Sequence, residues 1–290
     1  MYGAIIGDVV GSTYEFAGQK TKSFPLFPGG SDFTDDTIMT IAVAKALMRS
    51  AETEEPFDEV LVEEMRQLGE KYPHPKGGYG VRFREWLADP FPMPYNVAGN
   101  GSAMRVSPCG LFAVTLEEAL DLAETSAAVT HSHPEGIKGA QATAAAIFLA
   151  KTRHTKEEIR NYIRENFYPL DKTLDEIRPD YEFHGSCQDS VPQSIQAFLE
   201  SKNYEDALRN VISLGGDADT MGAITGAIAW SFYRFQTNKG ISIKMANMWI
   251  EAAEYLPEEW LDLVLEFDKL CRQREDAYAR EGNVKRIRLE

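Results

Sequence analysis

Cysteine is scarce in this sequence of 290 residues, and the three that occur, Cys109, Cys187 and Cys271, lie far apart. Their number is odd and no C-x-x-C pair is present, so neither a disulfide framework nor a zinc knuckle is indicated. Sparse cysteine is typical of a reducing compartment, and we therefore expect a cytoplasmic protein.

Long hydrophobic runs are also missing. No stretch approaches the ~18 apolar residues that a membrane span needs. At the N-terminus, Asp8 interrupts the apolar run early and no basic segment precedes it, so the pattern is not that of a signal peptide. We expect no association with a membrane.

Positive charge is in deficit. The chain has 30 Lys and Arg against 45 Asp and Glu, a formal net charge of -15. Such a surface repels phosphate backbones, which argues against a general nucleic-acid binder. A small pocket can still hold phosphate groups, because backbone amides and helix N-termini bind anions without a basic surface.

Strand signals are few, and most of the chain shows apolar residues at helical spacing. Residues 221–233 are apolar nearly all round, with Gly222 and Gly226 allowing close helix approach, a profile typical of a central helix in a large all-α domain. Residues 2–10 fit either a short strand or a buried helix, and periodicity cannot decide between them.

Two segments are predicted to be irregular. Residues 71–101 carry many Gly and Pro residues and are predicted to form a long functional loop with a short helix around 82–87. Residues 168–190 form the second irregular segment. Aromatic residues are scattered through both, so neither resembles a flexible linker, and we expect one compact multi-helix domain spanning residues 1–290.

Two acidic clusters stand directly before expected helices, Thr34-Asp35-Asp36-Thr37 and Gly215-Gly216-Asp217-Ala218-Asp219-Thr220. Each offers carboxylate and hydroxyl oxygens, the ligands that hard cations such as Mg²⁺ and Mn²⁺ prefer. The alternative is helix capping, since Thr and Asp are favoured at N-caps. Two clusters together argue against capping alone, because buried carboxylates repel one another unless a cation neutralises them.

A third group lies near the N-terminus, where Gly3, Gly7 and Gly11 are evenly spaced around Asp8 and precede Glu15. The dinucleotide fingerprint G-x-G-x-x-G is absent, so these glycines are a weak signal when taken alone. By themselves, Asp8 fits a helix cap and Glu15 fits a solvated loop residue.

Taken in order, five motifs resemble the ADP-ribosylglycohydrolase family, which includes ADP-ribosyl-acceptor hydrolases, dinitrogenase reductase-activating glycohydrolases and J1-type crystallins. The two Asp clusters are the most diagnostic of the five. The motifs are Gly7-Asp8-x-x-Gly11-Ser12-x-Tyr14-Glu15, Thr34-Asp35-Asp36-Thr37, Gly99-Asn100-Gly101-Ser102-Ala103-Met104-Arg105, Thr130-His131 and Gly215-Gly216-Asp217-Ala218-Asp219-Thr220.

The resemblance implies an all-α fold with a two-metal cleft, and a hydrolase that removes ADP-ribose from an ADP-ribosylated protein or small molecule. The implied cofactors are two Mg²⁺ ions, with Mn²⁺ as the alternative. The implied metal ligands are Thr34, Asp35 and Asp36 for one ion and Asp217 and Thr220 for the other, with Asp219 bridging the two.

The resemblance also implies a substrate site. The backbone amides of the third motif would bind the diphosphate, with the small residues allowing close approach. His131 would lie near the distal ribose or a phosphate, although a purely structural role suits it equally well. The implied substrate residues are Tyr79, Gly99, Asn100, Gly101, Ser102, Met104 and His131.

The chemistry to be explained is loss of an acceptor from the ribosyl carbon through an oxocarbenium-like transition state. Two metals about 3.5–4 Å apart can orient the ribose and acidify a water. Asp36 or Glu15 would act as base or proton donor, and the sequence leaves that choice open.

The sequence leaves alternatives both for the group that carries the ADP-ribose and for the class of function. N-linked arginine is the first expectation for a bacterial-looking member of the family, with O-linked serine and small-molecule conjugates as alternatives. A non-catalytic J1-crystallin-like protein is disfavoured because both Asp clusters are complete. A two-metal phosphohydrolase would leave the motif at residues 99–105 unexplained.

Overall fold

The computed structural model describes residues 1–235, 240–280 and 282. Within these residues the chain forms helices joined by loops, and strand-like pairing is limited to isolated bridges between loop segments. The predicted all-α fold is therefore confirmed, whereas one domain spanning residues 1–290 stays a prediction. The helices are α1 (Tyr2–Gly11), α2 (Asp35–Thr53), α3 (Phe57–Lys71), α4 (Val81–Ala88), α5 (Gly101–Met104), α6 (Ser107–Phe112), α7 (Leu116–Ala128), α8 (Pro134–Lys151), α9 (Lys156–Asn166), α10 (Leu174–Ile177), α11 (Cys187–Leu199), α12 (Tyr204–Ile212), α13 (Ala218–Phe235), α14 (Ile243–Ala253) and α15 (Glu258–Arg280).

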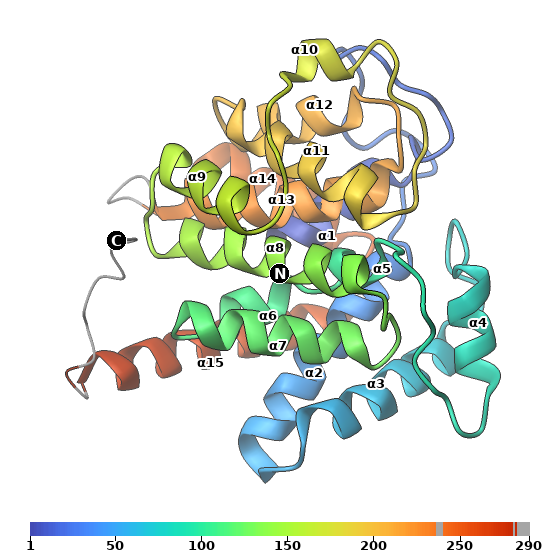
Figure 1. Cartoon of the computed structure of the whole chain (residues 1–290), viewed down its shortest axis with the longest axis vertical. Coiled ribbons are helices and arrows are strands. Elements are labelled where there is room, and N and C mark those ends of the chain that lie inside the picture. Colours follow the sequence, from blue (N-terminus) through green and yellow to red (C-terminus); the bar gives the residue numbers. More distant parts are fainter. Residues whose placement is uncertain (236–239, 281, 283–290) are drawn as a thin grey trace.

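Helices α1, α8 and α13 run through the middle of the molecule, between α10–α12 on one side and α2, α3, α7 and α15 on the other (Figure 1). Helix α1 serves two apolar cores, because Ile6 and Val10 pack into one and Ile5 and Val9 into the other. A helix buried on opposite faces has no polar stripe. This is why periodicity alone could not distinguish residues 2–10 from a strand. No helix in the described part of the chain is long and apolar enough to span a bilayer.

The tightest packing lies between α1 and α13. A Cβ atom added at Gly7 would stand 1.9 Å from the carbonyl oxygen of Gly222, well inside van der Waals contact. The expected close approach at Gly222 and Gly226 is thus confirmed, and the spaced glycines near the N-terminus are explained by helix packing. The other pairs in this contact are Gly3–Gly226 and Gly11–Ala218.

The two segments predicted to be irregular differ in outcome. Between residues 71 and 101 the short helix is present as α4, and the remainder up to α5 is loop. Residues 168–190 are more ordered than expected. Helix α10 begins with a reciprocal capping box between Thr173 and Glu176, which is a T-x-x-E pattern in the sequence. Helix α11 begins at Cys187, inside the segment that was expected to be irregular.

The contact between α1 and α13 predicts a severe effect of Gly7→Ala. A methyl group there meets backbone atoms that cannot rotate away, so the helices must separate, at a cost of about 3 kcal/mol or more. We expect a lowered melting temperature or loss of folded protein on thermal denaturation. Gly29→Ala is the matched control, since no atom lies within 4 Å of its Cβ position. Equal melting temperatures for the two variants would contradict this account of the fold.

Candidate functional site

A cleft with a volume of about 440 Å³ collects most of the predicted site residues from distant parts of the chain. Thr34 and Ser102 are the predicted residues that do not line it. Those that do are Glu15, Asp35, Asp36, Tyr79, Gly99, Asn100, Gly101, Met104, His131, Asp217, Asp219 and Thr220.

Asp8, in α1, anchors the first acidic cluster. Its buried carboxylate accepts hydrogen bonds from the backbone N–H groups of Thr34 (3.0 Å) and Thr37 (3.1 Å) and from both of their hydroxyl groups. Thr34 is itself the N-cap of α2, accepting from the N–H of Asp36. Capping therefore accounts for Asp8 and Thr34, and Asp8 has little capacity left for a metal because four donors already surround it.

Acidic side chains from the three segments, Asp8 included, converge at the starts of α2 and α13. The oxygens of Asp8, Asp36 and Asp219 lie within 4.8 Å of one another, and so do those of Glu15, Asp217 and Asp219. Asp219 belongs to both groups. Thr220 joins the two helix starts, since its hydroxyl lies 3.3 Å from Asp36 Oδ2. Asp35 is in neither group, although it lines the same cleft.

These carboxylates are buried without the cations that such burial requires. In the described part of the chain, none of the aspartates of the two clusters forms an ion pair with Lys or Arg. Burial, reinforced by neighbouring carboxylates, raises the pKa values of Asp36 and Asp219 well above the usual range, and burial raises the pKa of Asp217 to about 6. Asp36 Oδ1 is buried and has no hydrogen-bond partner. A divalent cation fits this donor set, because it would neutralise the charge and occupy the orphaned oxygen.

Glu15 lies at the edge of the same cluster, on the loop that follows α1. Its Oε2 atom lies 2.8 Å from the position a Cβ would take at Gly77, so a side chain there would displace the Glu15 carboxylate from its present position. Burial, followed by the charge of Asp219, raises the pKa of Glu15 to about 8. Glu15 is only partly buried and therefore remains accessible to a ligand in the cleft.

The motif at residues 99–105 lines the next part of the cleft. The Asn100 side chain donates to Asp217 Oδ2 at 2.8 Å, and so faces the acidic cluster. The N–H of Asn100 donates to Gly185, while those of Ala103 and Met104 donate to Asn100 within the turn. The Ser102 hydroxyl donates to the Gly136 carbonyl at 2.7 Å, away from the cleft. The backbone N–H groups of Gly99 and Gly101, which line the cleft, are not among those engaged in these bonds.

His131 lines the same cleft. Its ring packs against Gly99 and Gly101, with Nε2 3.1 Å from the position of a Cβ on Gly99. Tyr95 contacts the ring at a centroid distance of 5.0 Å. Arg105 is buried nearby and also lines the cleft. Tyr95 and Arg105 were not predicted as site residues, because their place in the cleft depends on tertiary contacts.

Tyr79 also lines the cleft. Its hydroxyl donates to the Tyr72 carbonyl at 2.9 Å, and its ring packs on Phe83. The hydroxyl is thus engaged within the protein, and what Tyr79 presents to the cleft is the ring. The turn before it contains Gly77 and Gly78, both in the left-handed region with φ of +75° and +81°.

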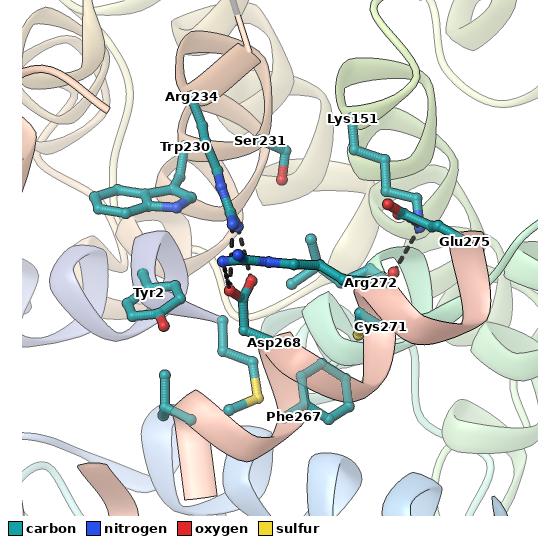
Figure 2. A pocket seen from close by; sticks show the side chains of 13 residues that line it. Tyr2, Lys151, Trp230, Ser231, Arg234, Phe267, Asp268, Cys271, Arg272 and Glu275 are labelled. Atoms are coloured by element: carbon teal, nitrogen blue, oxygen red, sulfur yellow. Dashed lines mark hydrogen bonds and ion pairs between the residues drawn. The ribbon is translucent and has the colours of Figure 1, made fainter. Parts of the chain in front are cut away.

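A second cavity, of about 260 Å³, is lined by residues of α15, the C-terminal half of α13, the start of α1 and the ends of α6 and α8 (Figure 2). Arg234 and Arg272 both point toward Asp268, with Arg234 Nη1 2.8 Å from Asp268 Oδ1. Lys151 pairs with Glu275 at 3.0 Å. The acids here have their cations within the protein, so these charges hold α15 in place. The contrast with the unpaired aspartates of the first cleft makes that cleft the candidate active site.

Comparison with known proteins gives one consistent family. A family model described as ADP-ribosylglycohydrolase matches residues 1–286. The chain is 26% identical to ADP-ribosylarginine hydrolase Tri1 of Pseudomonas putida over 93% of this chain and 79% of that protein. It is 26% identical to ADP-ribosylhydrolase ARH3 of Bos taurus, and 26% identical to ADP-ribosyl-[dinitrogen reductase] glycohydrolase of Rhodospirillum rubrum, in each case over 80% of this chain and 83% of the relative.

The fold is shared with a solved structure. A chain of an ADP-ribosylglycohydrolase-related protein complex superimposes with a TM-score of 0.68 at 23% identity, covering 93% of this chain and 95% of the other. At this identity the likeness concerns the fold, and it agrees with the helical architecture described above.

The position of Asp219 in both acidic groups predicts how metal binding responds to substitution. Asp219→Asn should weaken every cation bound in the cluster, because each loses a carboxylate and the remaining charges are less well shielded. Asp217→Asn should affect only the ion beside Asp217. Calorimetric titration with Mn²⁺ measures both, and Asp121→Asn on the exposed face of α7 is the control. Undisturbed Mn²⁺ binding in Asp219→Asn would return this residue to a helix-capping role.

Proposed function

Because the chain belongs to the ADP-ribosylglycohydrolase family, we propose that its cleft hydrolyses the glycosidic bond between ADP-ribose and an arginine side chain. Glycohydrolysis of ADP-ribosyl conjugates is the activity of this enzyme family, and arginine as acceptor is the proposed part. The observation that carries the proposal is the group of carboxylates around Asp219, buried without a protein cation at one end of the cleft.

The cluster is proposed to hold two divalent cations, Mg²⁺ or Mn²⁺. The residues that would hold them are Asp36, Asp217 and Asp219. Asp35 and Thr220 line the same cleft, and the Thr34 hydroxyl, although it also caps α2, lies 3.3 Å from Asp36 Oδ2. When bound, the cations supply Lewis-acid polarisation of water and of the ribose hydroxyl groups. Asp8 fixes the start of α2 and thereby keeps Thr34 and Asp36 in register with α13.

Glu15 is proposed as the proton-transfer residue and Asp36 as a metal ligand. Asp36 is almost fully buried between the two helix starts, whereas Glu15 lies on a loop at the cleft edge. A carboxylate bound directly to a cation is a weak base, because the cation lowers its pKa. The raised pKa of Glu15, about 8, suits a group that gives and takes a proton near neutral pH, although bound cations would lower it.

The reaction then balances as follows. The bond from the ribosyl carbon to the guanidino nitrogen breaks, the oxygen of a water adds to that carbon, and one water proton ends on the departing guanidino group. Glu15 relays this proton between the water and the leaving nitrogen. The products are ADP-ribose and free arginine.

The acceptor end of the cleft supports arginine. Phe16 follows Glu15 directly, and its ring stacks on that of Phe183 with centroids 5.5 Å apart. Both rings are exposed, at 76% and 46%, and Phe183 lines the cleft. A guanidinium group stacks on aromatic faces and pairs with carboxylates, whereas a serine linkage offers neither contact. One relative, Tri1, is named an ADP-ribosylarginine hydrolase.

The partner is proposed to be an ADP-ribosylated protein, with small ADP-ribosyl conjugates as the alternative. We also propose the cytoplasm as the compartment, which the three free and buried cysteines support. A non-catalytic protein and a phosphohydrolase remain the competing functions, and the experiment below separates them from the proposal.

A panel of defined linkages tests the proposal. We expect release of ADP-ribose from an ADP-ribosyl-arginine peptide at least about tenfold faster than from an ADP-ribosyl-serine peptide, a difference of about 1.4 kcal/mol in transition-state free energy. Chelator should abolish turnover and Mn²⁺ or Mg²⁺ should restore it. Released ADP-ribose and released phosphate are both measured by chromatography.

The controls of this panel assign each outcome. Phe183→Leu should lower kcat/KM for the arginine peptide more than for the serine peptide, because only guanidinium uses the aromatic face. Faster turnover of the serine peptide contradicts the acceptor assignment, phosphate release without ADP-ribose indicates a phosphohydrolase, and full activity in excess chelator contradicts the metal site.

The role of Glu15 gives a separate expectation. Glu15→Gln keeps the shape but removes the titratable oxygen, so kcat should fall by about 10²-fold or more while ADP-ribose affinity and melting temperature change little. The matched control is Glu182→Gln, an exposed acid beside Phe183. Steady-state kinetics together with calorimetry decide the question, and normal kcat in Glu15→Gln would leave this carboxylate a structural role.

A further inference from the structure

A hydrogen-bond chain runs from a buried cation to the histidine of the cleft. Arg105 Nη2 donates to the Thr130 hydroxyl at 2.7 Å and to the Ser126 carbonyl at 2.6 Å. The Thr130 hydroxyl oxygen lies 2.8 Å from His131 Nδ1. Arg105 and Thr130 are almost completely buried, at 1% and 0% exposure, so no solvent competes for these bonds.

The donor and acceptor of each hydrogen bond in this series follow from which groups can donate and which can accept. A guanidinium only donates, so Thr130 Oγ1 must accept from Arg105. The single hydroxyl proton of Thr130 then has two acceptors in reach, His131 Nδ1 at 2.8 Å and the Ala127 carbonyl at 3.4 Å. The shorter bond is much the stronger at these distances. With Nδ1 as the acceptor of this short bond, the ring proton lies on Nε2.

The ring is held in place from several sides. Gly99 and Gly101 lie against one edge, Tyr95 against its face, and the N–H of Tyr95 donates to the Thr130 carbonyl at 2.7 Å. Burial, followed by the charge of Arg105, lowers the pKa of His131 to about 3, so the ring stays neutral. His131 lines the cleft, and its Nε2 atom, beside Gly99 and Gly101, makes no hydrogen bond to any of the described residues.

The charge of Arg105 is itself unusual. It is among the largest fully buried side chains, and in the described part of the chain no carboxylate pairs with it. A buried cation without a counter-ion is costly unless something else uses it. A neutral donor would suffice to hold a loop, whereas a cation that lines the cleft also favours an anionic ligand there.

We propose that Arg105 is a positioning residue that acts through Thr130, fixing His131 as the tautomer with its proton on Nε2 so that this N–H donates to the ADP-ribose moiety. The proposal rests on the proposed function for the identity of the ligand. It assigns to Thr130 the task of transmitting the orientation, and to His131 the contact with the ligand.

The tautomer is measured directly by ¹⁵N NMR of the histidine side chains, without any ligand. In the wild-type protein His131 should show a protonated Nε2 and an unprotonated Nδ1. Thr130→Val removes the donor to Nδ1 and should mix the two tautomers, whereas Thr130→Ser keeps the hydroxyl and should preserve the wild-type pattern. His133 is the internal reference, since its Nδ1 accepts from the N–H of Glu135 and should not change.

A double-mutant cycle measures the consequence for binding. Thr130→Val should weaken ADP-ribose affinity about fivefold to tenfold, as expected for one hydrogen bond, and should have no further effect in a His131→Gln background. Arg105→Lys keeps the charge but not the two-pronged contact, and should match Thr130→Val. Calorimetry gives each dissociation constant, and melting temperatures verify folding.

Each outcome decides the proposal. A cycle in which Thr130→Val and His131→Gln simply add, or an unchanged tautomer in Thr130→Val, overturns it. If Arg105→Lys retains the wild-type affinity and tautomer while Thr130→Val loses both, Arg105 does not help to orient His131, and the proposal fails for that residue. A wild-type protein that does not bind ADP-ribose contradicts the proposed function instead, and the tautomer measurement still decides whether the chain of hydrogen bonds orients His131.

Discussion

The constraint on which the rest of this structure depends is the backbone contact between α1 and α13. With Gly7 against Gly222, the two helices approach as closely as main chains can, so neither can slide or rotate without a clash. The contact ends at Gly11, beside Ala218 at the start of α13. The loop that carries Glu15 therefore leaves α1 exactly where Asp217 and Asp219 begin α13, while Asp8 of the same helix caps α2. One rigid pair of helices thus brings all three acidic segments to a single point.

Such rigidity matters because the site opposes folding. Asp8 is buried but satisfied by four donors, and its burial serves the fold. Asp36, Asp217 and Asp219 are buried with fewer partners, and burial raises the pKa of each, reinforced at Asp36 and Asp219 by the charges of neighbouring carboxylates. A softer scaffold would relieve this repulsion by letting the helix starts move apart. Local departures from good packing and polar satisfaction are expected at functional sites, where the remainder of the fold compensates for them.

The sequence predicted those parts of the structure that depend on local chemistry. The start of α2 is an example, since Thr34 both caps the helix and precedes the acids. The sequence could not distinguish α1 from a strand. Ile5 and Ile6 pack into different cores, so the helix has no polar face that would reveal its periodicity. Contacts between side chains that are far apart in the sequence could not be predicted either. Nothing in the sequence near Arg105 indicates that its guanidinium donates to Thr130, and nothing near Phe16 indicates that its ring stacks on Phe183. The sequence therefore could not identify the acceptor.

The distribution of charge within the cleft resolves an apparent conflict. A chain with a net charge of -15 repels an anionic ligand at long range, so binding cannot rely on general electrostatic attraction. It must come from contacts made after the solvent has been excluded, where a single charge or dipole is worth far more than at the surface. Arg105, buried and unpaired by any described carboxylate, supplies such a charge near His131, and cations held by the carboxylates of the proposed metal site would supply another. The proposed ligand, anionic in its diphosphate, would therefore meet a protein cation at Arg105, while the acidic cluster would contact it only through bound metal ions.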